Sequence, residues 1–323
     1  MRAVVCQEFA PIDQLVIEER LDPEPAAGQV VVAVRAAGVN YVDGLFVQGK
    51  YQIKPPLPFT PGGEVAGDVV AVADDVEDVA VDDRVLAMPW IGGFASHVAL
   101  PARSVVPIPG DLTYGQAAGL VQSYGTMLFS FTRRVQLAAG EWVLVLGAGG
   151  GIGLAAIDVA RHLGARVIAA ASSPEKLAAA TAAGAEATID YEREDLKARA
   201  RELSGGGVDV VVDPVGDRWA EPALRSLRWM GRYLVIGFAG GDIPRLPINQ
   251  VLLNNRTLVG VDWGAWTGKD PAGNHALLRQ LMELAGSGQL HPVEPTEYPL
   301  DDVVRALTDL QERKVGGKVV LRP

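Results

Sequence analysis

The feature that most constrains the fold is a glycine-rich segment between two apolar runs, EWVLVLGAGGGIGLAAIDVARHLGARVIAAASS at residues 141–173. Gly147, Gly150 and Gly153 are spaced three apart, after a strand-like run and at the start of a run with helical periodicity. Without a Cβ, such a turn brings backbone N–H groups close to a pyrophosphate at a helix N-terminus, where the helix dipole favours negative charge. We therefore predict that this turn holds a pyrophosphate. A purely structural turn is the alternative, and the strand–turn–helix–strand context favours a dinucleotide.

The second strand of this segment indicates which dinucleotide binds. Enzymes that use NADH place an acid about 20 residues after the glycines, where it bonds the ribose 2′-hydroxyl. This chain has Ala171 there, followed by Ser172, Ser173 and Lys176, which offer donors to a 2′-phosphate. We therefore predict NADPH as the cofactor. The alternative is that Ser173 only caps the next helix and Lys176 is only solvated.

The remaining patterns divide the chain into a β-rich part and an α/β part. Up to about residue 110, short alternating or β-branched runs are separated by Gly, Pro and Asp. After a predicted helix over 115–135, apolar strand candidates occur at 143–147, 165–172, 187–190, 208–213, 232–238 and 257–264. Strands that alternate with helices predict a doubly wound parallel sheet. An amphipathic helix around 301–313 and a strand at the end of the sequence follow.

Composition excludes several classes of function. Acidic residues outnumber basic ones, 39 to 29, which argues against nucleic acid as a partner. The single cysteine, Cys6, excludes an intramolecular disulfide and any zinc site with two thiolates. The apolar stretch 142–157, which has no charged residue, has 16 residues, fewer than the roughly 20 that span a bilayer. With no signal-peptide pattern at the start, we expect no membrane association and a cytoplasmic location.

Several motifs together resemble one known family. PGGEVAG, GAGGGIG and SSPEKL, with GVNYVD, IDYERED, VVDPVG, LVIGFAGG, NNRTLVGVDWG and GGKVVL, span nearly the whole chain. In this combination the chain resembles the medium-chain dehydrogenase/reductase superfamily, specifically its zinc-free quinone oxidoreductase branch, which includes the zeta-crystallin relatives. The resemblance implies a GroES-like β-rich catalytic domain built from both ends of the chain, with a Rossmann domain inserted and the active site in the cleft. We expect the catalytic domain over 1–120 and 263–323, and the NADPH-binding domain over 121–262.

The resemblance also bears on metal use. The positions that match the catalytic zinc ligands of the superfamily's alcohol dehydrogenases are Asn40, Gly63 and Gln122, none of which is a thiolate or an imidazole. Reduction of a simple ketone develops a strongly basic alkoxide, which zinc usually stabilises. A quinone instead yields an anion with a phenol-like pKa of about 10, which hydrogen bonds alone can stabilise. We therefore expect a metal-free transfer of hydride from NADPH to a quinone or a similar conjugated carbonyl acceptor.

The resemblance assigns further residues. Asn40 and Tyr51 are expected to face the nicotinamide and the substrate, with Tyr51 as a proton donor or hydrogen-bond donor and Asp43 orienting their loop. On the cofactor, Thr126 would contact the nicotinamide ribose or carboxamide, and Arg313 would close over the bound molecule. The pyrophosphate would be held by Gly150, Gly151, Ile152 and Gly153. The 2′-phosphate would be surrounded by Ser172, Ser173, Lys176 and Tyr191. Phe238 and the region of Trp263 would flank the nicotinamide, with packing as the alternative for both aromatic residues.

Two other functions remain as alternatives, and the sequence also suggests an oligomeric state. An enoyl-CoA or 2-alkenal reductase would use the same hydride geometry, and an NADPH-binding structural or regulatory protein would show little turnover. His97, His162, His275 and His291 lie in scattered contexts that do not suggest a metal cluster. The segment TLVGVDWG is expected at the edge of the parallel sheet, where the resemblance implies that two copies pair into a homodimer.

Overall fold

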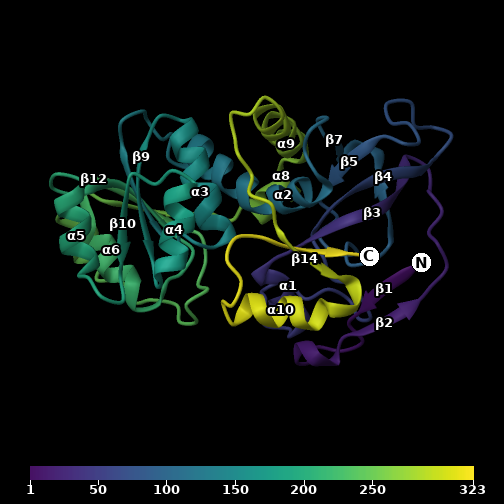
Figure 1. Ribbon diagram of the computed structural model, residues 1–323, viewed down its shortest axis with the longest axis horizontal. Helices are drawn as coiled ribbons and strands as arrows, with labels where there is room; N and C mark the ends of the chain where they lie inside the picture. The colour runs from purple at the N-terminus through teal and green to yellow at the C-terminus, as the bar shows by residue number, and fades with distance from the viewer. The chain divides into compact units, whose positions relative to one another are not determined.

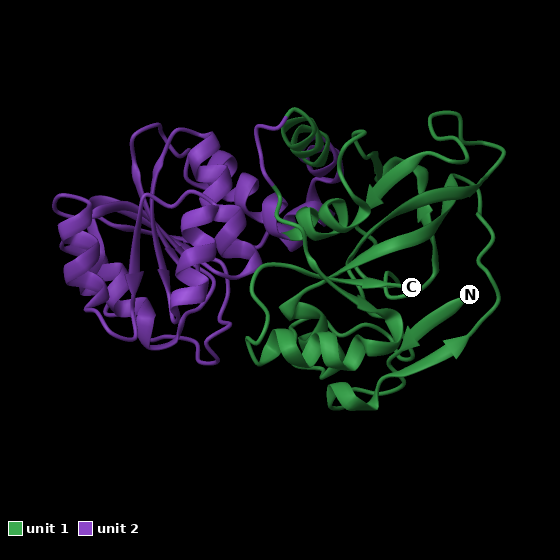
Figure 2. Cartoon of the chain, viewed as in Figure 1, with its two compact units in different colours: residues 1–122, 278–287, 292–323 green, residues 123–277, 288–291 purple.

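The computed structural model describes all 323 residues, Met1–Pro323, and they form two compact units (Figure 2). Unit 1 comprises 1–122, 278–287 and 292–323, and unit 2 comprises 123–277 and 288–291. The domain limits expected near residues 120 and 262 stay predictions about folding domains. The chain passes between the units within helix α2 (Tyr114–Phe129) and again within helix α9 (Pro271–Gly286).

Unit 1 is built on a mostly antiparallel sheet that combines distant parts of the sequence. Its strand order is β14-β15-β3-β4-β5-β7, and β6 pairs with β3. The strands are β3 (Gln29–Val39), β4 (Glu64–Val72), β5 (Arg84–Ala87), β6 (His97–Pro101), β7 (Val105–Pro107), β14 (Thr296–Pro299) and β15 (Val319–Arg322). β15 pairs with β3, so the last strand of the chain completes a sheet begun about 290 residues earlier. Strands from both ends of the chain thus belong to one sheet.

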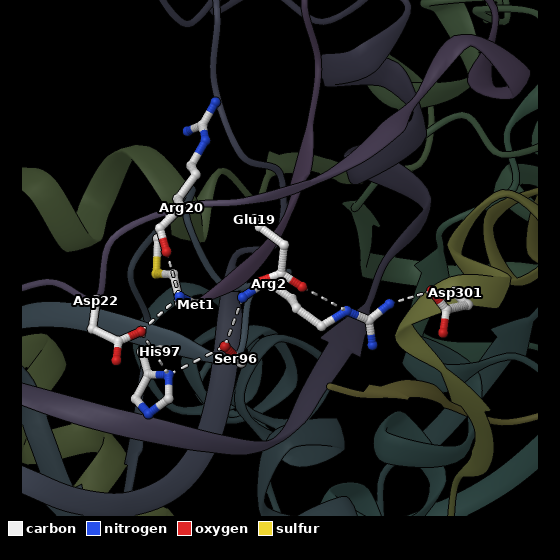
Figure 3. A network of polar contacts seen from close by, with 8 residues as sticks. All are labelled: Met1, Arg2, Glu19, Arg20, Asp22, Ser96, His97 and Asp301. Atoms are coloured by element: carbon white, nitrogen blue, oxygen red, sulfur yellow. Dashed lines mark hydrogen bonds and ion pairs between the residues drawn. The ribbon is translucent and has the colours of Figure 1, made fainter.

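Two helices and a hairpin cover the sheet of unit 1. Helix α1 (Tyr41–Val47) follows β3, and α10 (Val303–Gln311) contacts α1 and β15. β1 (Arg2–Val5) and β2 (Val16–Glu19) form an antiparallel pair. Polar contacts hold this hairpin in place: the Met1 amino group pairs with Asp22 at 2.6 Å, the Arg2 amide donates to Ser96 Oγ, and the Arg2 guanidinium pairs with Asp301 (Figure 3). In both ion pairs the acid, Asp22 or Asp301, is largely exposed, so each pair contributes little free energy.

Unit 2 is a six-stranded parallel sheet in the order β10-β9-β8-β11-β12-β13. Its strands are β8 (Trp142–Leu146), β9 (Arg166–Ala171), β10 (Ala187–Asp190), β11 (Val208–Asp213), β12 (Leu227–Val235) and β13 (Thr257–Gly260). The doubly wound parallel sheet predicted from the sequence is confirmed, with the predicted sixth strand, β13, at its edge. The central strands β8 and β11 are buried along their whole length, because helices cover both faces of the sheet.

The helices of unit 2 lie in two layers. α3 (Gly151–His162) and α4 (Pro174–Ala182) pack on one face of the sheet, and α5 (Leu196–Leu203) and α6 (Ala220–Ser226) pack on the other (Figure 1). Shorter helices follow at α7 (Asn249–Leu252) and α8 (Trp263–Lys269). No helix of the chain is both long and apolar enough to cross a membrane. This winding brings the loops after β8, β9, β10, β11 and β12 to the same edge of the sheet.

Candidate active site

The glycines of the turn after β8 have separable roles. Gly147 has a φ of 59°, and a Cβ on it would lie 2.9 Å from a methyl carbon of Val215. A Cβ on Gly153 would lie 2.5 Å from the Cα of Ala148, a backbone atom that cannot move aside cheaply. Both positions therefore need glycine for the backbone conformation or for the packing of α3 against its strand.

Gly150 differs from these two positions. It is the N-cap of α3, and no side chain caps the helix there. A Cβ on Gly150 would meet only the Gly147 carbonyl oxygen, at an ordinary 3.5 Å. The protein's own packing thus leaves space beside Gly150, next to the first-turn N–H groups contributed by Gly151, Ile152 and Gly153. This arrangement fits an anion at the N-terminus of a 12-residue helix.

The residues expected at a 2′-phosphate lie after β9. Ser173 caps α4 by accepting a hydrogen bond from the Lys176 amide at 3.4 Å, as the structural alternative predicted. Lys176 is more than a solvated side chain: its Nζ donates to Ser172 Oγ at 3.5 Å, and its stem packs where a Cβ on Gly149 would lie, 2.6 Å away. One lysine thus joins the loop after β9 to the turn after β8. The pKa of Glu175 is lowered, first by its own backbone N–H and then by the Ser173 hydroxyl, so this carboxylate competes for that hydroxyl.

Tyr191 lies at the same sheet edge, because its backbone N–H donates to the Ala171 carbonyl at 3.3 Å. Its side chain is 8% exposed and stacks on Trp219 with ring centroids 4.4 Å apart. Most of the ring therefore belongs to the core under α5 and α6. Its expected contact with the 2′-phosphate stays a prediction.

The loops after β11 and β12 form one hydrogen-bonded structure. The Ala239 N–H donates to the Pro214 carbonyl at 3.0 Å, and Phe238 packs over Gly216, where a Cβ would lie 3.0 Å from its ring. Phe238 is 37% exposed, so its ring has a free face. Trp263 is 4% exposed and fills the space over Gly125, so packing explains this residue.

Sequence reasoning missed the residue that shapes this region, Asp213 at the end of β11. Its Oδ1 accepts the N–H groups of Val215 and Gly216, each at 2.8 Å, and its other oxygen accepts the Tyr233 hydroxyl. Burial raises the pKa of Asp213, while these three donors favour its charged form. The available signal was an acid that ends an apolar strand directly before Pro-Val-Gly.

Thr126 and Arg313, also expected at the cofactor, lie in different units. Thr126 is a buried residue of α2 in unit 2, and its carbonyl accepts the Ser130 hydroxyl at 2.7 Å. Arg313 follows α10 in unit 1, is exposed, and has a φ of 60°. Both roles stay predictions.

In unit 1, the expected substrate residues gather around helix α1. Asn40 is the N-cap of α1, and its backbone N–H donates to Asp43 Oδ2 at 2.7 Å. Tyr51 packs its ring against Phe46 of the same helix, with centroids 4.8 Å apart. Burial raises the pKa of Asp43 to about 7, although the Asn40 N–H opposes the shift. Asp43 therefore holds the backbone of Asn40, which is consistent with its expected role in orienting this loop.

The side chain of Asn40 belongs to a buried polar network that sequence reasoning did not find. Glu64 is fully buried; its Oε1 accepts Asn40 Nδ2 at 2.8 Å and pairs with Lys318 Nζ at 2.5 Å. Its Oε2 accepts the Gln122 N–H at 2.7 Å, and Lys318 Nζ also donates to Asn40 Oδ1. The sequence signal was a charged residue at the start of one buried strand, in PGGEVAG, and another directly before a second buried strand, in GGKVVL.

The positions expected to match zinc ligands, Asn40, Gly63 and Gln122, thus meet around Glu64. Glu64 bonds two of them and is the chain neighbour of the third. In the structure, no three His, Cys, Asp or Glu side chains lie close enough together to hold a metal ion.

Comparison with known proteins agrees with this architecture. The family model "Alcohol dehydrogenase GroES-like domain" matches residues 26–110, and "Zinc-binding dehydrogenase" matches 151–283. The chain is 39% identical over 325 residues to "Quinone oxidoreductase-like protein 2 homolog" of Nematostella vectensis, covering 99% of this chain and 88% of that protein.

Solved structures resemble the whole chain. The quinone oxidoreductase of Escherichia coli, solved in complex with NADPH, is 27% identical with a TM-score of 0.89, over 100% of both chains. The quinone oxidoreductase of Thermus thermophilus is 31% identical with a TM-score of 0.85, again over 100% of both chains. Unit 1 is thus a GroES-like domain and unit 2 a Rossmann-type domain.

Proposed function

Because the chain belongs to the quinone oxidoreductase branch of the medium-chain dehydrogenase/reductase superfamily, we propose that it is an NADPH-dependent oxidoreductase that reduces a quinone or a similar conjugated carbonyl compound. The observation that carries this proposal is the carboxyl edge of the parallel sheet in unit 2. There, α3 begins without a side-chain cap, and the Lys176 stem packs against Gly149 of the turn that leads into it. This edge offers N–H donors to a pyrophosphate and an ammonium to a 2′-phosphate.

The residues present suit NADPH. The first turn of α3 would hold the pyrophosphate, and Ser172, Ser173 and Lys176 would hold the 2′-phosphate. Ala171 stands where an acid would repel that phosphate. The exposed face of Phe238 would lie against the nicotinamide. When bound, NADPH supplies a hydride; the residues of the chain orient the cofactor and the acceptor.

The acceptor side of the proposal rests on Asn40 and Tyr51. An amide N–H and a phenol O–H are hydrogen-bond donors that stabilise a weakly basic oxyanion. The position of Gly63, where the superfamily's alcohol dehydrogenases have a zinc ligand, carries no side chain, and Glu64 beside it is already paired with Lys318. These residues favour an acceptor whose reduced form needs no metal, hence a conjugated carbonyl acceptor rather than a simple ketone.

The test is an acceptor panel with the purified protein. We expect oxidation of NADPH with 1,4-naphthoquinone, and we expect dialysis against a chelator to leave the rate unchanged. Activity lost on chelation and restored by zinc would contradict the metal-free reaction. A preference for crotonyl-CoA would instead identify an enoyl reductase, and NADPH binding without turnover of any acceptor would identify a binding protein.

We also propose that two copies pair through strand β13. This strand forms an edge of the parallel sheet, so one side of it presents unpaired backbone donors and acceptors. Exposed apolar side chains lie on or close in sequence to β12 and β13: Trp229, Met230, Leu252, Leu253 and Leu258. Light scattering should give twice the chain mass of 34.1 kDa, and a monomer at micromolar concentration would refute the pairing.

We also propose that the protein is located in the cytoplasm. Its single cysteine, Cys6, is a buried free thiol, which is typical of a protein from a reducing compartment.

A further inference from the structure

The buried network around Asn40 determines which way its side-chain amide faces. A lysine ammonium only donates hydrogen bonds, so the Asn40 atom that it contacts must be the oxygen, Oδ1. The amide nitrogen then faces Glu64, which accepts one of its two hydrogens at 2.8 Å. Oδ1 is occupied by a cation and one N–H by a carboxylate. The donor that remains for a substrate is the second N–H of Nδ2.

Two glycines leave room for this network. A Cβ on Gly38, in β3, would lie 2.2 Å from Glu64 Oε1. A Cβ on Gly119, in α2, would lie 2.8 Å from Cγ of Lys318. The charged side chains come from the first residue of β4 and from the residue before β15, and Lys318 is 11% exposed at its side chain. The backbones of two separate elements, β3 and α2, thus leave space for an ion pair that touches Asn40.

Stability alone is a weak explanation for such an ion pair. Removing two charges from water costs about as much as their attraction returns, so apolar residues often replace a buried pair without loss. This ion pair hydrogen-bonds both the oxygen and the nitrogen of the Asn40 side-chain amide, which apolar residues cannot do. Resting on the proposed function, we propose that Lys318 and Glu64 are positioning residues that hold Asn40 as a hydrogen-bond donor to the carbonyl oxygen of the acceptor.

The first test moves Lys318 without changing any charge. Alanine at Gly119 brings a Cβ to within 2.8 Å of the lysine stem, so Lys318 must shift, while the helix itself gains propensity. We expect Gly119→Ala to lower kcat/KM for the quinone at least tenfold, with NADPH affinity and melting temperature near those of the wild type. The matched control is Gly268→Ala, also a helical glycine, where a Cβ would meet nothing within 4 Å. Equal activity of the two variants would overturn the proposal.

The second test separates positioning from charge balance. Glu64→Gln/Lys318→Met replaces the ion pair by neutral side chains of similar size, which should keep the protein folded. We expect kcat/KM to fall about 100-fold, the scale of a lost oxyanion donor, without loss of NADPH binding. In an Asn40→Ala background, the same double substitution should cause no further loss, because its effect passes through Asn40. A folded double variant with wild-type kinetics, or equal losses in both backgrounds, would refute the role.

Failure of this inference and failure of the proposed function give different results. If the wild-type protein reduces no conjugated acceptor with NADPH, the proposed function fails. If the wild type is active and Gly119→Ala matches Gly268→Ala, the inference alone fails. Should the double variant not fold, Gly119→Ala with the Asn40→Ala background still decides the question.

Discussion

Asp43 makes the stability of unit 1 depend on pH in a way that can be worked out from its surroundings. Asp43 lies in the first turn of α1 and is 1% exposed, and its carboxyl accepts the backbone N–H groups of Asn40 and Gly62. Desolvation raises its pKa from 3.8 to about 7; Glu64 adds to the shift, and Lys318 opposes it. Between these two pKa values the folded protein holds a proton that the unfolded chain has released.

The sign follows from this difference in bound protons. The free energy of unfolding falls as pH rises wherever the native state binds more protons than the unfolded chain. Asp43 therefore lowers this free energy progressively from about pH 4 to about pH 7, and its contribution stays constant above that range. A shift of three units corresponds to about 4 kcal/mol in total, at about 1.4 kcal/mol per unit. About 3 kcal/mol of this loss of stability occurs between pH 5 and pH 8.5.

The perturbation is Asp43→Asn, which resembles the protonated acid in shape and does not titrate. Urea unfolding followed by circular dichroism should be measured for both proteins at pH 5 and pH 8.5. Between pH 5 and pH 8.5, we expect the free energy of unfolding of the variant to rise by about 3 kcal/mol relative to that of the wild type. This change does not depend on the difference in stability that the two proteins show at pH 5. Because all other titrating groups are shared, their contributions largely cancel in the difference. A difference that does not change with pH would refute the reasoning.

Two further predictions concern the cofactor site. Gly150→Val should weaken NADPH binding at least tenfold in a calorimetric titration. Its melting temperature should stay near that of the wild type, because a Cβ at this position meets only one protein atom, at 3.5 Å. By contrast, Gly153→Val should lower the melting temperature, since its Cβ would lie 2.5 Å from a backbone atom. Comparable losses of stability in both variants would show that the space beside Gly150 is not reserved for a ligand. Lys176→Ala should raise the Kd for NADPH by ten- to a hundredfold, the scale of a lost charged hydrogen bond, and should change the Kd for NADH little. Equal changes for the two dinucleotides would remove the 2′-phosphate assignment.

The parts of this protein that sequence reasoning predicted are those in which neighbouring residues carry the information. The parallel sheet of unit 2 follows from apolar runs alternating with helices, and the turn after β8 follows from glycines at a fixed spacing. The missing acid at Ala171 and the serines after it could be read directly, because β9 and its loop are contiguous in the sequence. Within such segments, the backbone conformation is specified locally.

Only the tertiary structure decided which distant polar groups would meet. Asn40, Glu64 and Lys318 are separated by up to 278 residues, and no local pattern relates them. They are joined because β15 pairs with β3 and β3 pairs with β4, which brings three distant chain segments together at a buried position. The sequence by itself therefore determined the elements and the glycine turn, since periodicity and conformational freedom are local properties. The folded chain determined the ion pair that holds Asn40, since burial forces charged groups to find partners wherever the sheet places them.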